Sequence, residues 1–403
     1  MLWNTLSGWE GFVVKITATR DMPLMHTGER NVVLFHPFIP PEAIDEVADT
    51  LRTRWIGQGP KVTQFEKLFS DVEGEGYPSL AVGSGTDSLH LAYKLCGVDE
   101  NAEVIAPIFT CTATNIPFLY ERATIKFIDI EASSLNMDVS AIEKNITERT
   151  KAIVVVHYGG FPCNLDELNR IEKQYGIPVI QDGAHALGLE WRGRHMAHWS
   201  HYTMYSFQAI KHITTGDGGM LVINSPDDEI VNRAQRMRWF GIDREKKQGG
   251  IWENDIVDIG YKYQMTDLGA CVGLAGLKHI SWILNHRRKL LGIYEERLSA
   301  VPGVTFFSGS VRNEDGNYRH AAWLCTILAE RRLDLQTKLY ENGIETNQVH
   351  YRNDRYSIFE RHWRGHAFPN MDRVTDNYLV LPVHHLVTEE DAFRICDLIR
   401  AGW

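Results

Sequence analysis

A single lysine, Lys211, stands between a short apolar and aromatic segment and a glycine-rich turn. Residues 202–207 have the composition of a buried strand, residues 214–219 are polar and rich in glycine, and residues 220–224 predict the next strand. A lysine at the end of a buried strand, with few other charges beside it, loses hydration, and this loss lowers the pKa of its amine. Such an amine is able to form a Schiff base with a carbonyl compound.

An aspartate, Asp182, follows another predicted strand at residues 177–181. Open α/β sheets bind their ligands at the carboxyl ends of their strands. The ordinary structural role of an aspartate here is to cap a helix, whereas its chemical role would be to keep a proton on a ring nitrogen. Two opposite charges ~4 Å apart attract by about 4 kcal/mol at an effective dielectric constant of 20, which changes a protonation equilibrium about a thousandfold.

A Gly-Ser-Gly-Thr turn at residues 83–86 precedes a predicted helix. The apolar residues of that helix recur with the spacing of one buried face: Leu89, Ala92, Tyr93 and Cys96. The free backbone N–H groups at the start of a helix bind phosphate. A phosphate-binding turn, an acid after a strand and a lysine after a strand therefore follow one another along the chain.

In this order the three features resemble fold type I pyridoxal-phosphate (PLP) enzymes, and more closely the DegT–DnrJ–StrS family of nucleotide-sugar aminotransferases. The resemblance extends over about residues 31–403 and includes residues 55–66, 103–110, 260–267 and 381–384. It implies PLP as cofactor, L-glutamate as amino donor and a nucleotide-linked keto sugar as acceptor. It also implies a homodimer with shared active sites.

The segments between residues 80 and 225 alternate between strand-like and helical patterns, which predicts a mainly parallel sheet with helices on both faces. With the resemblance, this predicts a three-layer α/β/α large domain at residues 31–285 and a smaller C-terminal α+β domain at residues 286–403. One long amphipathic helix is expected from Thr266 to Leu298. A strand is expected at residues 322–328, with helices at 334–342 and 389–401. Residues 1–30 fit the family poorly and are expected to be a disordered leader or a start assigned too far upstream, with Met22 and Met25 as alternative starts.

The resemblance also implies roles for particular residues. Lys211 holds the cofactor and then acts as general acid and base, and Asp182 keeps the cofactor ring protonated. The other cofactor contacts fall on Gly85, Thr86, Asp87, Cys111, His185, Ser206 and Lys262, of which Lys262 reaches in from the partner subunit. Candidate substrate contacts are Gly57, His320, His350, Tyr351 and Arg352, and further candidates for the nucleotide and its diphosphate are Trp239, Arg244, Trp252 and Arg355.

Two departures from the family pattern affect these expectations. Many relatives place an aromatic ring against the cofactor where this chain has Cys111, so stacking on the cofactor should weaken. Relatives often carry a histidine just before a Leu-Phe pair where this chain has Ala-Trp-Leu-Cys at residues 322–325, which puts the sugar contacts in doubt. Residues 214–219 resemble relatives that aminate carbon 4 of a 4-keto-6-deoxy sugar, and the expected pathways make cell-surface polysaccharide of the lipopolysaccharide type or other aminosugars.

Other functions are weighed against this one. A related PLP-dependent sugar 3-dehydratase would carry histidine in place of the lysine, and His212 follows Lys211 directly. A non-catalytic PLP-binding regulator is the second alternative. The histidines show no HExxH spacing, so no metal site is expected.

The bulk properties fit a cytoplasmic enzyme. The 403 residues carry a net charge of −10, which disfavours a nucleic-acid surface, and no stretch is long and apolar enough for a membrane span. Six scattered cysteines indicate reduced thiols.

Overall fold

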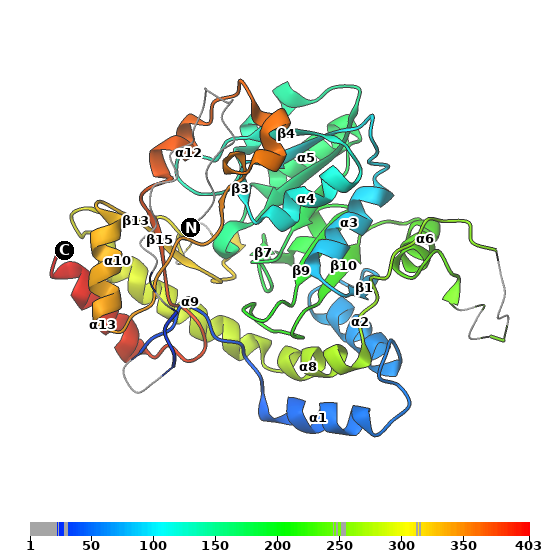
Figure 1. The fold of residues 1–403 in the computed structure, drawn as a ribbon, viewed down its shortest axis with the longest axis horizontal. Helices are drawn as coiled ribbons and strands as arrows, with labels where there is room; N and C mark the ends of the chain where they lie inside the picture. Colours follow the sequence, from blue (N-terminus) through cyan, green and yellow to red (C-terminus); the bar gives the residue numbers. More distant parts are fainter. Residues whose placement is uncertain are drawn as a thin grey trace, which may run out of the picture.

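The computed structural model describes residues 22, 24–27, 31–244, 246, 249–250, 255–311, 313 and 316–403. Most of the predicted leader, residues 1–30, and the candidate Trp252 lie outside the described residues. Figure 1 shows a large body built around a twisted sheet and a smaller body that carries the C-terminus. No helix in the described part of the chain has both the length and the apolar composition needed to span a bilayer.

A seven-stranded sheet organises the large body (Figure 1). Its strands, in spatial order, are β1 (Ser79–Val82), β10 (Gly219–Ile223), β9 (Tyr202–Ser206), β6 (Val179–Asp182), β5 (Thr150–Val156), β2 (Glu103–Pro107) and β4 (Thr124–Ile128). The strands from β9 to β4 run parallel, and β10 and β1 add antiparallel pairs at one edge. The mainly parallel sheet predicted from the sequence is confirmed.

Helices cover both faces of this sheet, because successive side chains on each strand point to opposite sides. On β2, Val104 and Ala106 join one apolar cluster, whereas Ile105 joins another. The first face carries α3 (Gly85–Leu95), α4 (Thr112–Tyr120) and α6 (Asp228–Arg238). The second face carries α2 (Pro60–Val72), α5 (Leu165–Tyr175) and α8 (Asp267–Leu277), and α1 (Pro41–Leu51) packs on α8.

A three-stranded antiparallel sheet organises the smaller body, in the order β11 (Val304–Phe306), β13 (Cys325–Ala329) and β15 (Tyr378–Leu381). It shares an apolar cluster with α9 (Ile280–Leu298), α10 (Arg332–Glu341) and α13 (Glu389–Arg400). The shorter elements are β3 (Phe109–Thr110), β7 (Glu190–Trp191), β8 (Arg194–His195), β12 (Tyr318–Arg319), β14 (Tyr351–Arg352), α11 (Glu360–Trp363) and α12 (Pro369–Val374).

Contacts cross the predicted division at residue 285, which stays a prediction. Val32, near the start of the described chain, bridges to Ile344 and joins the apolar cluster of the small sheet. In the other direction, β14 pairs with β3, and α11 packs on β4. Residues from both halves of the sequence therefore meet where the two bodies join.

Two sequence-based expectations of secondary structure are wrong. The single helix expected from Thr266 to Leu298 is two helices, because His279 leaves helical geometry (φ −102°, ψ 2°) and lies 2.6 Å from Glu42 of α1. The break allows α8 to pack against α1 and α2, while α9 packs against α13. The strand expected from residue 322 begins at Cys325. Residues 183–188 form turns, so Asp182 does not take the alternative role of a helix cap.

Asp267, the first residue of α8, fixes the start of α2. The N-cap of α2 is Gly59, which has no side chain to accept from the free N–H groups of the first turn. The carboxylate of Asp267, which is completely buried, accepts instead from the backbone N–H of Gly59 (2.7 Å), Lys61 (3.2 Å) and Val62 (3.1 Å). The loop that precedes α2, residues 55–59, is anchored through this one carboxylate.

We predict that Asp267→Ala lowers the free energy of unfolding by about 1–3 kcal/mol, because three backbone donors lose their acceptor. Urea denaturation followed by circular dichroism measures the change. The matched control is Asp71→Ala, which removes an exposed ion pair with Lys67 and should change stability by less than about 0.5 kcal/mol. Equal effects of the two substitutions would contradict the anchoring role.

Candidate active site

Lys211 and Asp182 lie at the carboxyl edge of two neighbouring parallel strands. Asp182 is the last residue of β6, and Lys211 follows the end of β9, the strand beside it. Both side chains are buried. Burial lowers the pKa of the Lys211 amine to about 8, while Cys111 and Asp182 act in the opposite direction. The lowered pKa expected from the sequence is therefore found in the structure.

The Asp182 carboxylate is held in one orientation by two donors. Thr114 Oγ1 donates to Oδ2 (2.7 Å), and the backbone N–H of Ala184 donates to Oδ1 (3.0 Å). Thr110 Oγ1 lies 2.7 Å from Thr114 Oγ1 and continues the chain of hydroxyl groups. Burial raises the pKa of Asp182, against the effect of these donors and of Lys211. A buried carboxylate of this kind is stabilised by a cationic group placed against it.

The start of α3 forms a cradle beside the end of β9. The N-cap Ser84 accepts from the backbone N–H of Asp87 (3.0 Å). A Cβ added to Gly85 would lie 3.3 Å from Ser206 Oγ, and one added to Gly219 would lie 2.5 Å from the carbonyl oxygen of Ser84. Gly85 and Ser206 therefore lie against each other, and a side chain at residue 219 would clash with the start of α3.

Thr86 and Asp87 occupy the next two positions of the same helix turn and are partly exposed. Burial of its carboxyl group raises the pKa of Asp87 to about 6. The predicted phosphate-end residues therefore lie together at the first turn of α3.

His185 and His350 form a hydrogen-bonded pair next to Lys211. Their Nε2 atoms are 3.1 Å apart and their rings are stacked. His185 Nδ1 accepts from the backbone N–H of Gly159 (3.3 Å), so His185 carries its proton on Nε2 and donates it to His350. Burial lowers the pKa of both imidazoles, that of His350 to about 3, and the nearby Lys211 adds to the effect. The pair is therefore neutral.

Trp323 was not predicted from the sequence as a site residue, yet it covers Lys211. The Lys211 Nζ lies 3.8 Å from the centre of its ring, and the ring of His185 stacks on it at 3.9 Å. Cys111, the N-cap of α4, is partly exposed and faces Lys211 closely enough to affect its pKa.

The other candidate substrate residues have different surroundings. His320 is buried, with Nε2 2.8 Å from the Ser308 carbonyl oxygen and Nδ1 accepting from the backbone N–H of Ala322 (2.8 Å), so both ring nitrogens are in use. Arg352 binds the carboxylates of Asp354 and Asp372.

Tyr351 pairs with Thr110 across β14 and β3, which places it beside the cofactor side of the sheet. Arg355 lies over the Tyr351 ring at 4.6 Å. His350 lies within hydrogen-bonding distance of a residue predicted to contact the cofactor, His185.

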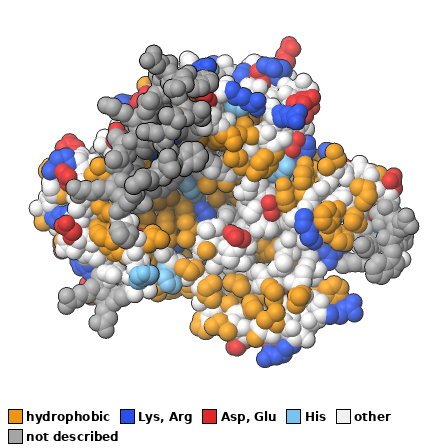
Figure 2. Space-filling view, in the orientation of Figure 1, with side chains coloured by type: hydrophobic (Ala, Val, Ile, Leu, Met, Phe, Trp, Pro, Cys, Tyr) orange, Lys and Arg blue, Asp and Glu red, His pale blue; other side chains and the backbone are white. Residues whose placement is uncertain are grey.

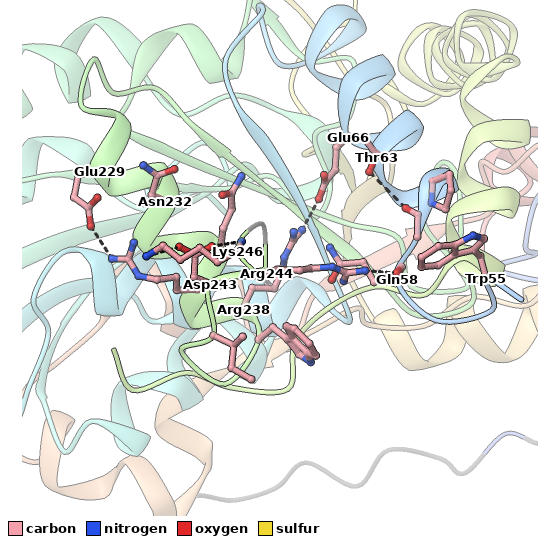
Figure 3. A pocket seen from close by; sticks show the side chains of 16 residues that line it. Trp55, Gln58, Thr63, Glu66, Glu229, Asn232, Arg238, Asp243, Arg244 and Lys246 are labelled. Carbon is pink, nitrogen blue, oxygen red and sulfur yellow. Dashed lines mark hydrogen bonds and ion pairs between the residues drawn. The ribbon is translucent and has the colours of Figure 1, made fainter. Parts of the chain in front are cut away.

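A second group of candidates lines a separate cavity of about 670 Å³ between the start of α2 and α6 (Figure 3). Trp239 and Arg244 lie together on its wall, with the Arg244 guanidinium 5.5 Å from the Trp239 ring and donating to the Gln58 carbonyl oxygen. Gly57 lies on the adjoining loop, where its carbonyl oxygen accepts from the backbone N–H of Asp267 (2.7 Å). The backbone of Lys262 forms an isolated antiparallel β-bridge with the backbone of Trp239.

The arrangement fits PLP by its donor set. A helix N-terminus and a hydroxyl group meet at Gly85 and Ser206, where glycine lets the first turn of α3 lie directly against the serine, and such a pair of donors suits a phosphate group. Asp182 offers a buried carboxylate for a protonated ring nitrogen, and Lys211 offers a buried amine that makes no hydrogen bond within the described part of the chain. Among described residues, no three His, Cys, Asp or Glu side chains gather as a metal site would require.

Two site residues escaped the sequence-based prediction for different reasons. Thr114 lies in the first turn of α4, four residues after Thr110, which ends β3, and the resemblance at residues 103–110 already pointed to this part of the chain. Trp323 had no comparable signal, because nothing in the local sequence links it to Lys211.

Comparison with known proteins agrees with this geometry. The profile of the DegT/DnrJ/EryC1/StrS aminotransferase family matches residues 37–400. A UDP-4-amino-4-deoxy-L-arabinose–oxoglutarate aminotransferase of Shewanella sediminis is 36% identical over 277 residues, which are 68% of this chain and 70% of that protein. The crystal structure of AtS13 from Actinomadura melliaura matches with a TM-score of 0.84 at 34% identity, over 94% of this chain and 100% of AtS13. Spr1654 from Streptococcus pneumoniae, solved in its PLP form, matches with a TM-score of 0.84 at 27% identity, over 92% and 98% of the two chains.

We predict that PLP attaches to the cofactor-free protein at a rate that rises with pH up to about 8 and then levels off. Only the neutral amine attacks a carbonyl, and below its pKa the neutral fraction falls about tenfold per pH unit. The growth of visible absorbance after mixing with PLP measures the rate. A midpoint near the ordinary lysine value of 10.5 would contradict the lowered pKa, and Lys211→Arg serves as the blank.

Proposed function

Because the chain belongs to the DegT/DnrJ/EryC1/StrS aminotransferase family and PLP is the cofactor of that family, we propose that it transfers the amino group of L-glutamate to carbon 4 of a nucleotide-linked 4-keto-6-deoxy sugar. The observation that carries the proposal is the buried pair of Lys211 and Asp182 beside the phosphate cradle at Gly85. The proposed pathway makes aminosugars for a cell-surface polysaccharide of the lipopolysaccharide type.

Two observations support carbon 4 as the position of amination. The Shewanella relative is named for a 4-amino-4-deoxy sugar. Residues 214–219 of this chain resemble relatives that act at carbon 4, and this loop packs against α8, where Thr215 lies next to Gly269 and Gly273. The loop therefore has a fixed place directly after Lys211.

The bound cofactor supplies a carbonyl carbon for the amine and a ring that accepts electrons. Asp182 would accept from the protonated ring nitrogen, because Thr114 and the backbone N–H of Ala184 orient its carboxylate and a cationic ring offsets the cost of its burial. Lys211 takes the α-proton of the amino donor on Nζ and returns it in the second half of the reaction. Ser206 and the first turn of α3 bind the phosphate group.

The neutral His185–His350 pair is proposed as one wall of the acceptor site. His350 Nε2 accepts from His185, so in the neutral ring its proton is on Nδ1. Tyr158 packs edge-on against both rings, at 5.7 Å from His185 and 6.4 Å from His350. The pair adds no charge next to the Lys211 amine and therefore leaves the lowered pKa of that amine in place.

The cavity in Figure 3 is proposed to receive the nucleotide diphosphate. Its basic side chains Arg236, Arg238 and Lys246 are paired with carboxylates. Arg244 forms no carboxylate ion pair within the described residues and lies over Trp239, so a guanidinium and an indole stand together on the cavity wall. This combination suits a phosphate group and a stacked base.

A homodimer with shared active sites is part of the proposal. Hydrophobic side chains gather over α1 at the lower edge of the face in Figure 2, and Ile44 and Leu51 of this helix are 68% and 58% exposed. Near Lys262, Val257 and Ile259 are 69% and 82% exposed. Apolar surface of this extent is stabilised when a second copy covers it. Lys262 would then reach the partner's cofactor.

The alternatives have less support. A sugar 3-dehydratase would present a histidine where Lys211 stands, and His212 points elsewhere, since its Nε2 lies 2.8 Å from the carbonyl oxygen of Ala321. A non-catalytic regulator has no need for a buried amine with a lowered pKa. Both alternatives are separated from the proposal by one spectroscopic experiment.

We predict that L-glutamate alone bleaches the visible absorbance of the PLP-loaded protein, because the amino group moves to the cofactor. Absorbance spectra measure the change, and 2-oxoglutarate should appear in equal amount. Lys211→Ala should bind PLP but release no 2-oxoglutarate, since the proton carrier is lost. A wild-type spectrum unchanged by glutamate would favour the regulator.

After treatment with L-glutamate the protein carries the cofactor in its amine form, and this form of the protein is used to identify the acceptor. It is mixed with a panel of nucleotide-linked keto sugars that differ in the position of the keto group, and the return of the visible absorbance is followed. The proposal expects a 4-keto-6-deoxy sugar to restore the absorbance. Restoration by 3-keto sugars alone would overturn the assignment to carbon 4, while glutamate turnover would still stand.

We predict that two inactive variants, Lys211→Ala and Lys262→Ala, regain activity when their subunits are mixed. In a mixed dimer one site receives both native lysines, so about a quarter of the wild-type activity should return after exchange of subunits. Activity before and after mild denaturation and refolding of the mixture measures the effect. No gain in a mixture that forms dimers would show that Lys262 does not reach the partner's site.

A further inference from the structure

Trp323 makes two contacts with the lysine segment. Its ring face lies under the Lys211 Nζ at 3.8 Å, and its indole N–H donates to the carbonyl oxygen of Ile210 (3.2 Å). One contact is with the reactive amine, and the other is with the backbone next to that residue. The indole therefore contacts the lysine segment at two points, the amine of Lys211 and the peptide group that precedes Lys211.

The indole has no freedom to turn away. Phe35 stacks on Trp323 at 5.6 Å between ring centres and His185 at 3.9 Å, with interplanar angles of 18° and 22°. The backbone N–H of Trp323 donates to the Gly159 carbonyl oxygen (2.9 Å), and the N–H of Gly159 donates to His185. Trp323 is also almost completely buried. Its position is therefore set by the N-terminal segment, the large body and the small body together.

The turn that presents Trp323 is strained. Ala322 has φ +54°, which is unusual for a residue with a Cβ. His320 holds this conformation by accepting from the backbone N–H of Ala322 (2.8 Å). A Cβ on Gly160 would lie 2.9 Å from the backbone nitrogen of Ala322, so the turn packs directly on residues 159–160. Strain kept in place by several contacts is a feature of functional sites.

We propose that Trp323 is a positioning residue that holds the side chain of Lys211, as an ammonium group, on its indole face between the two proton transfers of the reaction. The inference rests on the proposed role of Lys211 as proton carrier. When Nζ takes a proton from the donor carbon, a C–H bond breaks, an N–H bond forms, and a positive charge arises in a buried place. The electron-rich face of an indole is the surface that stabilises this charge without a competing base.

Among the described groups around Lys211, the indole is the one suited to stabilise the positive charge of the ammonium. His185, His350 and His212 are neutral because burial lowers their pKa values. Asp182 is oriented by Thr114 and the backbone and is committed to the cofactor ring. Cys111 carries a thiol, which covers much less of the amine than a ring would. Residue 111 therefore supplies no aromatic ring to the site. Trp323 supplies one instead, and its ring lies against Lys211 rather than against the cofactor.

The test measures the protonation of Lys211 directly. The full-length protein is loaded with pyridoxamine phosphate, so that Lys211 is free, and is labelled with a trace of acetic anhydride between pH 5 and pH 11. Peptide mass spectrometry gives the rate at Lys211. The labelling rate of Lys211 at pH 6.5, divided by its plateau value at high pH, gives the fraction of the Lys211 amine that is neutral at pH 6.5. Because both rates depend equally on how easily the reagent reaches the amine, this accessibility cancels from the ratio.

For Trp323→Leu the ratio should rise about 2- to 30-fold, because the ammonium loses the indole face. Trp323→Phe keeps a ring face and should stay closer to the wild-type ratio than Trp323→Leu. Asp71→Ala, which removes only the exposed ion pair with Lys67, should leave the ratio unchanged. Trp323→Met repeats the test if the leucine variant fails to fold.

An unchanged or lower ratio in the folded leucine or methionine variant would overturn the proposal, because loss of packing alone hydrates the amine and stabilises the ammonium. Glutamate-dependent bleaching of the wild-type protein is measured in parallel. If that bleaching fails, the proposed function is wrong. If only the labelling result fails, the role of Trp323 is wrong and the proposed function stands.

Discussion

The burial of a carboxylate and an amine at the same edge of one sheet is the constraint on which the rest of this structure depends. Asp182 and Lys211 follow neighbouring parallel strands, and each is removed from water. Burial favours the neutral form of each group, while each charge stabilises the other. Such a pair is costly to fold without a ligand that engages both groups, and a protonated pyridine ring with a carbonyl group that reacts with the neutral amine is such a ligand.

Much of the surrounding structure limits how these two groups can move. Thr114 and Thr110 orient the carboxylate, and the hydroxyl chain begins on the short strand that pairs with β14. The glycines at 85 and 219 bring the start of α3 against Ser206. Asp267 anchors the start of α2, and α8, which it begins, packs on the loop after Lys211. The same helix therefore connects the lysine loop with the loop at residues 55–59.

The smaller body contributes directly to the site. His350 and Trp323 both come from the last quarter of the chain. Trp323 contacts Lys211 and His350 contacts His185 beside it, and each side chain is presented by a residue with left-handed backbone, Ala322 or His350 itself. His320, expected to touch the sugar, instead holds the turn of Ala322 with both ring nitrogens engaged. A shift between the two bodies would therefore change the walls around Lys211, and this couples the relative position of the two bodies to the chemistry.

The sequence by itself determined the parts whose signals are local. The existence of the strands next to Asp182 and before Lys211 and of the helix after the turn at residues 83–86 was predicted correctly, because strand and helix periodicity and turn chemistry depend on adjacent residues. The tertiary structure alone decided which distant side chains surround that lysine and which helices break. Trp323 reaches Lys211 across 112 positions of sequence, and the break at His279 depends on packing against α1 and α13. Contacts of this kind arise from the packing of whole elements, and no spacing within a short segment records them.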